Sequence, residues 1–233
     1  GTTGNGSFLL NAPIDTCGRY TIDPVPHDRS YFESQLVAVN NYFRSVSYGK
    51  FGLDLDQSIV FPLSDENSYV LPKTMDYYHP YNQTDIHDQR VTELFRDALE
   101  TAYNDDEIDF SNFDHVVIFH AGIGQDFSLP FLDPTPEDIP STFIDDDMLQ
   151  EFVGGMLQFG TVTINQGIIL PETQNHLFYQ ESENIFLDAE EPCDYQYGLT
   201  GTFALMLGFA IGLPPLWDTN SGQSGIGIFG LMD

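Results

Sequence analysis

Residues 203–233 read FALMLGFAIGLPPLWDTNSGQSGIGIFGLMD, and this stretch decides which fold the chain is expected to adopt. It begins as an apolar run that ends at Trp217 and contains two prolines. A helix needs at least about 18 apolar residues to cross a bilayer, so this run is too short and too broken to do so. We therefore expect a buried helix from Gly198 to Ile211, followed by a glycine-rich segment that ends near Met232.

Apolar residues at helical spacing predict two earlier helices. The first follows the pattern Ser30-x-x-Glu33, which is typical of a capping box, and ends at Gly49. The second runs from about Thr84 to Tyr103.

Three further segments predict strands. Polar and apolar residues alternate in the first, residues 53–63 (LDLDQSIVFPL). The second, residues 115–124 (HVVIFHAGIG), is typical of a central strand in a mixed sheet, and the third comprises residues 160–170 (GTVTINQGIIL). A short strand and an extended arm are expected before residue 28. Helices that alternate with strands indicate an α/β or α+β fold, which we expect to form one domain over residues 1–233.

The charge balance limits the choice of partners. The chain has 36 acidic and 7 basic residues, which gives a net charge of −29. A surface of this sign repels the phosphates of nucleic acids and of anionic membranes, so we expect neither as a partner. Calcium, cationic partners or a saline medium fit better, although the acids could also serve only to keep the chain soluble.

Cys17 and Cys193 are the two cysteines, and they lie far apart in the sequence. Neither belongs to a CxxC motif, which argues against a metal knuckle or a redox site. They form either a disulfide, which we expect if the protein is exported, or two free buried thiols. The chain begins at Gly1 without an initiator methionine or a leader, which predicts a processed or excised part of a longer secreted chain.

Metzincin-type zinc proteases carry the motif HExxHxxGxxH on a helix that precedes a methionine turn. The first two histidines lie one turn apart and bind the metal, the glutamate activates a water, and the glycine lets the chain turn toward a third ligand. In this sequence Gly212 occupies the position of that glycine, and Met232 suits the methionine turn.

The chain resembles the peptidase domain of the immune inhibitor A-type family of secreted zinc metallopeptidases. In that family the helix reads like FAHEFGHxLGLPDLYD, and a glycine-rich stretch ending in LMD follows. The matching segments cover nearly the whole chain: GSFLL, PHDRSYFESQL, YFRSVSYGK, DIDFSNFDHVVIFHAGIGQD, DIPSTF and LPET. The resemblance implies a metzincin-like fold in which a twisted mixed sheet carries the first two helices.

The departures from the family pattern fall on its catalytic positions. Leu205 stands where the family has the first histidine, Met206 replaces the catalytic glutamate, Phe209 the second histidine and Pro215 the third ligand. These side chains do not bind zinc tightly, and without a metal no water is activated. The resemblance thus implies a pseudopeptidase without zinc, in which apolar side chains have filled the former site and become core.

We expect Leu205 and Phe209 to face apolar residues of the methionine turn, Ile228 and Met232. The domain is then a secreted, catalytically inactive protein that acts as a binding, scaffold, adhesion or surface component, through a protein partner or self-assembly. The alternative is a hydrolase or peptidase with a relocated metal or a carboxylate-based site. Among the histidines only His120 is a candidate, and its simpler interpretation is a hydrogen-bonded strand residue.

Calcium is the remaining candidate cofactor. Asp218-x-Asn220-x-Gly222-x-Ser224 places oxygen ligands at alternate positions around a glycine turn, as calcium loops do, although Phe229 stands where an EF-hand has its distal glutamate. Other acidic clusters are either calcium ligands or solvated turns: Asp105, Asp106, Glu107 and Asp109; Asp145, Asp146 and Asp147; and Asp188, Glu190, Glu191 and Asp194.

Overall fold

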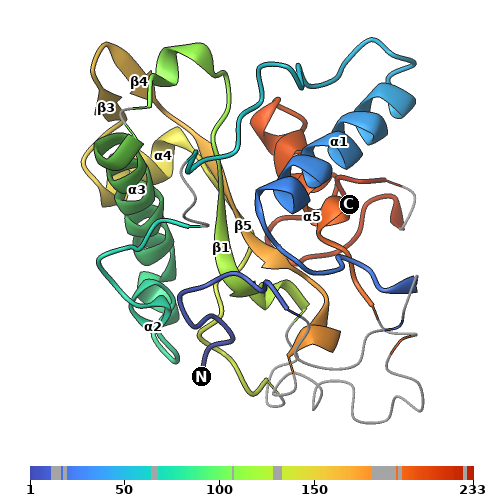
Figure 1. The fold of residues 1–233 in the computed structure, drawn as a ribbon, viewed down its shortest axis with the longest axis horizontal. Helices are drawn as coiled ribbons and strands as arrows, with labels where there is room; N and C mark the ends of the chain where they lie inside the picture. The colour runs from blue at the N-terminus through green and yellow to red at the C-terminus, as the bar shows by residue number, and fades with distance from the viewer. Residues whose placement is uncertain are drawn as a thin grey trace.

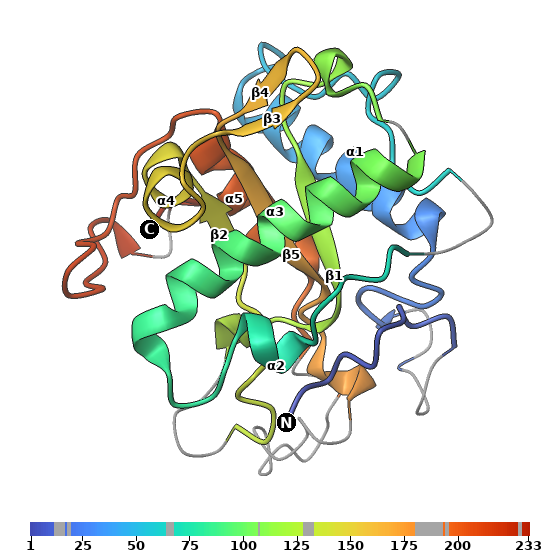
Figure 2. The ribbon, with the colours of Figure 1, turned by 90° about the vertical axis from the view of Figure 1, so that its left-hand side faces the viewer.

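A small mixed sheet lies between two layers of helices in the computed structural model of the chain (Figures 1 and 2). The structure describes residues 1–11, 17, 20–63, 68–106, 108–127, 133–179, 193, 196–227 and 230–233. On one face of the sheet lie α1 (Arg29–Val46) and α5 (Leu199–Ala210); on the other lie α3 (His87–Asp106) and α4 (Asp146–Phe152). This mixed α/β architecture agrees with the expected α+β class.

The sheet has the strand order β1-β5-β2. The central strand is β5 (Gly167–Thr173), which pairs parallel with β1 (Val117–Ile123) and antiparallel with β2 (Thr142–Ile144). Every residue of β5 is buried, as expected for a strand with helices on both faces. The prediction that residues 115–124 form the central strand is therefore wrong, because β1 is an edge strand and most of its residues are only half-buried.

Two other strand predictions also need correction. The segment 160–170 is not one strand, because β4 (Val162–Ile164) turns back on β3 (Leu157–Phe159) in a separate hairpin. At the turn Gly160 adopts φ +60°, which favours glycine. The segment 53–63 contains no strand, although its side chains alternate in polarity; it crosses in front of β1 as an irregular segment (Figure 1).

The helices follow the apolar periodicity closely, but one cap differs from the prediction. Asp28 is the N-cap of α1, because its carboxylate accepts a hydrogen bond from the backbone N–H of Tyr31. Ser30 instead donates its hydroxyl to Asp28, so the expected capping box with Glu33 does not form. The predicted second helix begins as a 3₁₀ turn (Thr84–Ile86) and continues as α3, and α5 matches its predicted range within one residue.

Shorter elements complete the fold. The helix α2 (Met75–Tyr78) precedes α3, and 3₁₀ turns lie at Phe110–Asn112, Gln125–Phe127 and His176–Phe178. No helix among the described residues is long and apolar enough to cross a membrane.

The core is divided by the sheet. Neighbouring residues of β5 point to opposite sides, so Ile169 packs with Phe95 of α3 while Ile168 packs with Val39 of α1 and Phe203 of α5. The two helical layers are therefore joined through a single fully buried strand.

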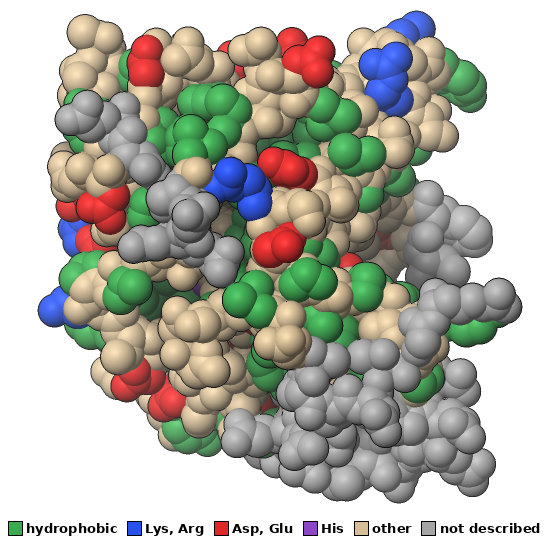
Figure 3. All heavy atoms as spheres, viewed as in Figure 1, with side chains coloured by type: hydrophobic (Ala, Val, Ile, Leu, Met, Phe, Trp, Pro, Cys, Tyr) green, Lys and Arg blue, Asp and Glu red, His purple; other side chains and the backbone are tan. Residues whose placement is uncertain are grey.

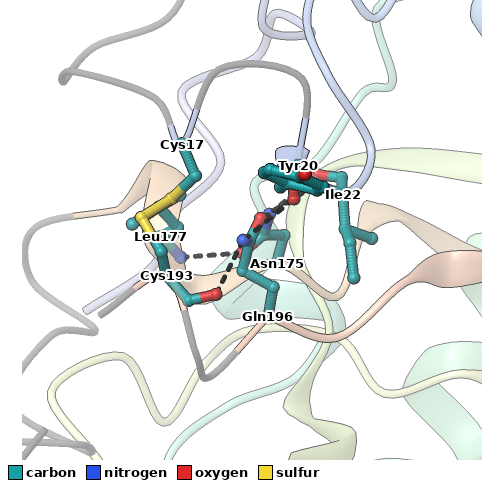
Figure 4. Close-up of a disulfide and its surroundings, with 7 residues drawn as sticks. All are labelled: Cys17, Tyr20, Ile22, Asn175, Leu177, Cys193 and Gln196. Carbon is teal, nitrogen blue, oxygen red and sulfur yellow. Dashed lines mark hydrogen bonds between the residues drawn. A yellow bond between two sulfur atoms is a disulfide. The ribbon is translucent and has the colours of Figure 1, made fainter. Parts of the chain in front are cut away.

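The predicted disulfide between Cys17 and Cys193 is confirmed, with Cα atoms 5.8 Å apart (Figure 4). Beside it the amide group of Gln196 donates to the carbonyl oxygens of Cys193 (2.9 Å) and Tyr20 (3.2 Å) and accepts from the N–H of Ile22 (2.8 Å). The N-terminal arm is thus joined to the segment that precedes α5. Such a bridge persists in oxidising compartments and is compatible with an extracellular protein.

Replacing both cysteines by serine should lower the free energy of unfolding by about 2–5 kcal/mol, because the bridge closes a long loop in the unfolded chain. Urea titrations of wild type and the Cys17→Ser/Cys193→Ser variant measure this difference. Wild type treated with a reductant is the control and should unfold at the same urea concentration as the variant. An unchanged midpoint in the variant would show that the hydrogen bonds of Gln196 suffice without the bridge.

Candidate functional site

The helix α5 carries three of the four positions at which zinc-binding or catalytic residues were expected to be lost. Leu205, Met206 and Phe209 are half-buried, and Pro215, beyond the helix, is exposed. The side of α5 that faces the sheet and α1 consists of other residues: Leu199, Phe203, Ala204, Leu207, Gly208 and Ala210. The expectation that the former site has become core is therefore wrong in part, because these three residues lie on the rim of the core.

Two aromatic residues that the sequence did not single out border this rim. The ring of Phe209 stacks on that of Phe143 in β2, with centroids 6.1 Å apart, and meets the ring of Trp217 edge-on at 5.7 Å. Residues 143 and 217 lie far apart in the chain, so no local pattern could reveal this contact. Position 209 is thus occupied by an aromatic cluster with no ligand atom.

Met232 packs against α5, although at a different place from the one expected. It is buried, and a Cβ atom built on Gly208 would lie 2.6 Å from its sulfur, so a larger residue at position 208 would displace the end of this methionine side chain. The carbonyl oxygen of Met232 also accepts from the N–H of Leu216 (2.6 Å), which fixes the C-terminal segment beside the helix. Ile228 and Phe229 lie outside the described residues.

The candidate calcium loop has internal hydrogen bonds at Asp218 and Ser224. Asp218 accepts hydrogen bonds from the backbone N–H groups of Asn220 (2.9 Å) and Ser221 (3.2 Å), and these bonds lower the pKa of Asp218. The hydroxyl of Ser224 donates to Asp233 (2.7 Å), which holds the pKa of that carboxyl below its usual value. The loop has the hydrogen bonding of a backbone turn.

Two of the other acidic clusters contain helix caps. Asp109 accepts from Ser111 at a 3₁₀ turn, and Asp145 accepts from the N–H of Met148 at the start of α4. Asp105, Asp146 and Asp147 are exposed. The other candidates lie outside the description: the side chain of Asp106, and Glu107, Asp188, Glu190, Glu191 and Asp194. Among described residues no group of three or more His, Cys, Asp and Glu is arranged to hold a metal. Calcium binding stays a prediction.

The histidines show one grouping that the sequence did not indicate. The rings of His79 and His87 lie 4.0 Å apart. His79 directly follows α2 and His87 is the first residue of α3, so the end of one helix lies beside the start of the other. Burial lowers the pKa of His79 to about 4, and His87 acts in the same direction. His120 hydrogen-bonds the carbonyl oxygens of Ala121 (3.0 Å) and Ile139 (3.1 Å), and burial lowers its pKa. His120 thus has the contacts of an ordinary strand histidine.

Several buried polar groups surround Glu172 at the end of β5. Its carboxylate accepts from the N–H groups of Leu9 (2.9 Å) and Gly122 (2.9 Å), from Nδ1 of His27 (3.1 Å) and from the hydroxyl of Tyr179. Both ring nitrogens of His27 face oxygens, because Nε2 lies 2.9 Å from the carbonyl oxygen of Asp23. His27 thus links the carboxylate of Glu172 to the backbone of Asp23. With every oxygen engaged, this carboxylate serves structure and is not available for chemistry.

A second buried carboxylate, Asp23, positions α5. The N-cap residue Gly198 has no side chain to cap the helix, and Asp23 supplies the missing acceptor for the N–H of Leu199 (2.8 Å). The same carboxylate accepts from Thr173 (2.9 Å) and from the amide of Gln35 (3.1 Å). One residue of the N-terminal arm thus joins β5, α1 and α5.

Asp138 is a buried carboxylate with only one of its oxygens engaged. Oδ1 accepts from the N–H (2.7 Å) and the hydroxyl (2.9 Å) of Thr3, while Oδ2 is buried without a hydrogen-bond partner. Burial raises the pKa of Asp138 to about 6. The folded state therefore binds a proton more readily than the unfolded state, and stability is highest below the unfolded pKa and falls as the pH rises toward 6.

Substituting Asp138→Asn should keep both hydrogen bonds from Thr3 and remove this pH dependence. Relative to the variant, wild type should lose about 2–3 kcal/mol of unfolding free energy as the pH rises from about 4 to about 7. Urea titrations of both proteins over that range give the difference. A difference that stays constant with pH would show that Asp138 titrates normally in the folded protein.

Comparisons with known proteins identify no relative. No protein-family model matches the chain, and searches of curated proteins and of solved structures found no match. Conclusions about function therefore depend on the residues described above.

Proposed function

We propose that this chain is a secreted, catalytically inactive metallopeptidase-like protein of the immune inhibitor A type, which acts by binding as a scaffold or surface component. The observation that carries the proposal is the half-buried face of α5. There Leu205, Met206 and Phe209 present carbon and one thioether where a zinc peptidase needs two imidazoles and a carboxylate. A thioether is a weak ligand for zinc, so this face lacks both metal and base.

The architecture supports the proposed metzincin-like fold. A mixed sheet that carries α1 and α3, and a helix α5 that leads to a buried Met232, are features expected from the resemblance. The antiparallel edge strand β2 lies next to α5, since Phe143 stacks on Phe209. In this proposal the scaffold is retained while the catalytic groups are lost.

A binding role is supported by apolar side chains that gather just beyond α5. Leu213, Leu216 and Ile226 are 41%, 42% and 49% exposed. Leu213 lies near Gly208, and Leu216 and Ile226 both lie beside Gly230, so the three surround the C-terminal end of the helix. Together with Phe209 and Trp217 they form an apolar rim. Contiguous exposed apolar patches mark protein–protein interaction sites, among other binding surfaces.

The extracellular part of the proposal is supported by the disulfide and by the charge. The bridge between Cys17 and Cys193 is compatible with an oxidising compartment, and a net charge of −29 favours a cationic partner over nucleic acid.

The purified protein should not hydrolyse casein or fluorogenic peptides, even with added zinc, because no side chain at the former site can activate water. The measurement is the initial rate with and without a chelator, together with metal analysis of the protein as purified. Cleavage well above a blank that a chelator abolishes, or stoichiometric zinc, would instead favour the alternative of an enzyme with a relocated site.

Restoring the motif with Leu205→His, Met206→Glu and Phe209→His should destabilise the protein rather than recover zinc binding. Phe209 loses two ring contacts of about 0.5–1.5 kcal/mol each, and Pro215 still withholds the third ligand. We expect a loss of about 1–3 kcal/mol and no rise of the melting temperature with zinc. The variant Leu205→Ala/Phe209→Ala is the control for lost packing alone. A zinc-dependent rise in melting temperature would mean that the ligand geometry has been kept.

A further inference from the structure

A large cavity lies at the β1 edge of the sheet, opposite the β2 edge where Phe209 of α5 packs. Its volume is about 1430 Å³, above the usual range of about 300–1,000 Å³ for ligand pockets. Its walls include fully buried residues such as Leu94 as well as the exposed Val70, so it reaches from the core to solvent. Of α5 only Phe203 and Leu207, on the buried side of the helix, contribute to it.

The lining shows that this cavity runs along an edge of the sheet. All residues from Asn112 to Ala121 line it in unbroken succession. Successive side chains of a strand point to opposite faces, so a pocket on one face would contact only alternate residues. The walls come from both helical layers, with Phe32 and Leu36 of α1 on one side and Ala98 and Leu99 of α3 on the other. The cavity is therefore a slot beside β1, between the two layers.

The edge of β1 that borders the slot has no strand partner among the described residues. β1 pairs with β5 alone, along its other edge. The N-terminal arm covers only the end of the open edge, where the N–H of Ile123 donates to Thr3 (2.9 Å). From Val117 to His120 the edge faces the slot. An open strand edge with apolar walls on both sides can offer both backbone hydrogen bonds and hydrophobic burial to one bound polypeptide segment.

We propose that the slot binds an extended segment of a partner protein, which adds a strand to β1. This bound segment, the guest strand, is apolar, because helices would cover both of its faces and strands buried on both faces are continuous apolar runs. Its length is about six residues, which is typical of strands. An empty slot forfeits packing contacts, and water within it meets mostly apolar walls. This inference does not depend on the loss of catalysis proposed for α5.

The charges around the slot indicate which residues flank the guest. Five acidic residues line it: Asp28, Glu33, Asp54, Asp76 and Asp114. Only Arg29 and Lys73 oppose them, and Arg29 already donates to the carbonyl oxygen of Pro62. Figure 3 views this side of the molecule and shows acidic side chains spread among hydrophobic ones. Lysine or arginine on both sides of the apolar run would complement this surface.

A segment of the chain itself lies over the slot but does not fill it. Ile59 and Leu63 line the cavity and are nevertheless 47% and 57% exposed, so their side chains are not inserted into the core. Figure 2 shows the segment that follows α1 on the outer side of β1. It acts as a cover that a guest strand would have to displace or pass beneath.

The test uses a fluorescent peptide with about six alternating valine and isoleucine residues between lysines, titrated with the intact protein. We expect saturable binding that weakens as salt is added and that is lost when glutamates replace the lysines. Two further peptides are N-methylated at alternate residues, one on each edge of the strand. One of them should bind at least about tenfold more weakly, since its methyl groups block the bonds to β1, and the other should bind like the parent.

The variant Ala98→Trp places a large ring in the slot and should reduce binding by at least about tenfold. The control is Glu100→Trp, on the exposed face of the same helix. Binding is compared only if both variants melt near the wild-type temperature; the N-methylated peptides test the proposal on wild type in any case.

Three results would overturn the proposal. The first is no binding of the lysine-flanked peptide. The second is an equal effect of the two N-methylated peptides, which would exclude pairing along one strand edge. The third is slow hydrogen exchange of the amides of residues 58–63 together with cross-strand contacts to Val117–His120, which would mean that the chain fills its own slot.

Discussion

The carboxylate of Glu172 is the point on which the rest of the structure depends. Its side chain is 1% exposed, and donors from the N-terminal arm, from the segment before α1, from β1 and from the turn after β5 converge on it. Removing any one of these donors would be costly, because the desolvation of the buried carboxylate would then no longer be compensated. The four segments must therefore dock together. The position of β1 beside β5 therefore depends on the side chain of Glu172, which accepts from Gly122 of β1, as well as on the backbone hydrogen bonds between the two strands.

The same end of β5 also determines where α5 lies. Thr173 follows Glu172 and donates to Asp23, which in turn accepts from the first helical N–H of α5. The helix that resembles a zinc-binding helix is thus positioned by a network that contains no metal ligand. The position of α5 therefore does not depend on the side chains at positions 205, 206 and 209. Leu205, Met206 and Phe209 project from the rim of a helix whose position is fixed elsewhere.

The sequence predicted what depends on local periodicity and missed what depends on distant contacts. The helices α1 and α3 follow from the spacing of apolar residues, because a helix buries one stripe whatever it packs against. Alternation in residues 53–63 did not make a strand, since a strand also needs a partner edge. Residues 115–124 and β5 are both compact apolar runs, so composition could not say which is central. At the candidate site the sequence showed apolar residues at positions 205, 206 and 209, but not their contacts with Phe143 and Trp217, which come from remote positions.

The exposed edge of β1 and the charge of the chain are connected. A long apolar edge strand invites pairing with a second copy, and proteins usually blunt such edges with charge or cover them. Here the cover is partial, and the edge strand itself carries no acidic side chain. The acids stand around the slot instead, on a chain whose net charge is −29. Two copies approaching edge to edge would bring like charges together, whereas a cationic segment would be drawn in. In the proposed strand addition, the acidic composition would thus select cationic segments over a second copy of the chain, beyond any effect on solubility.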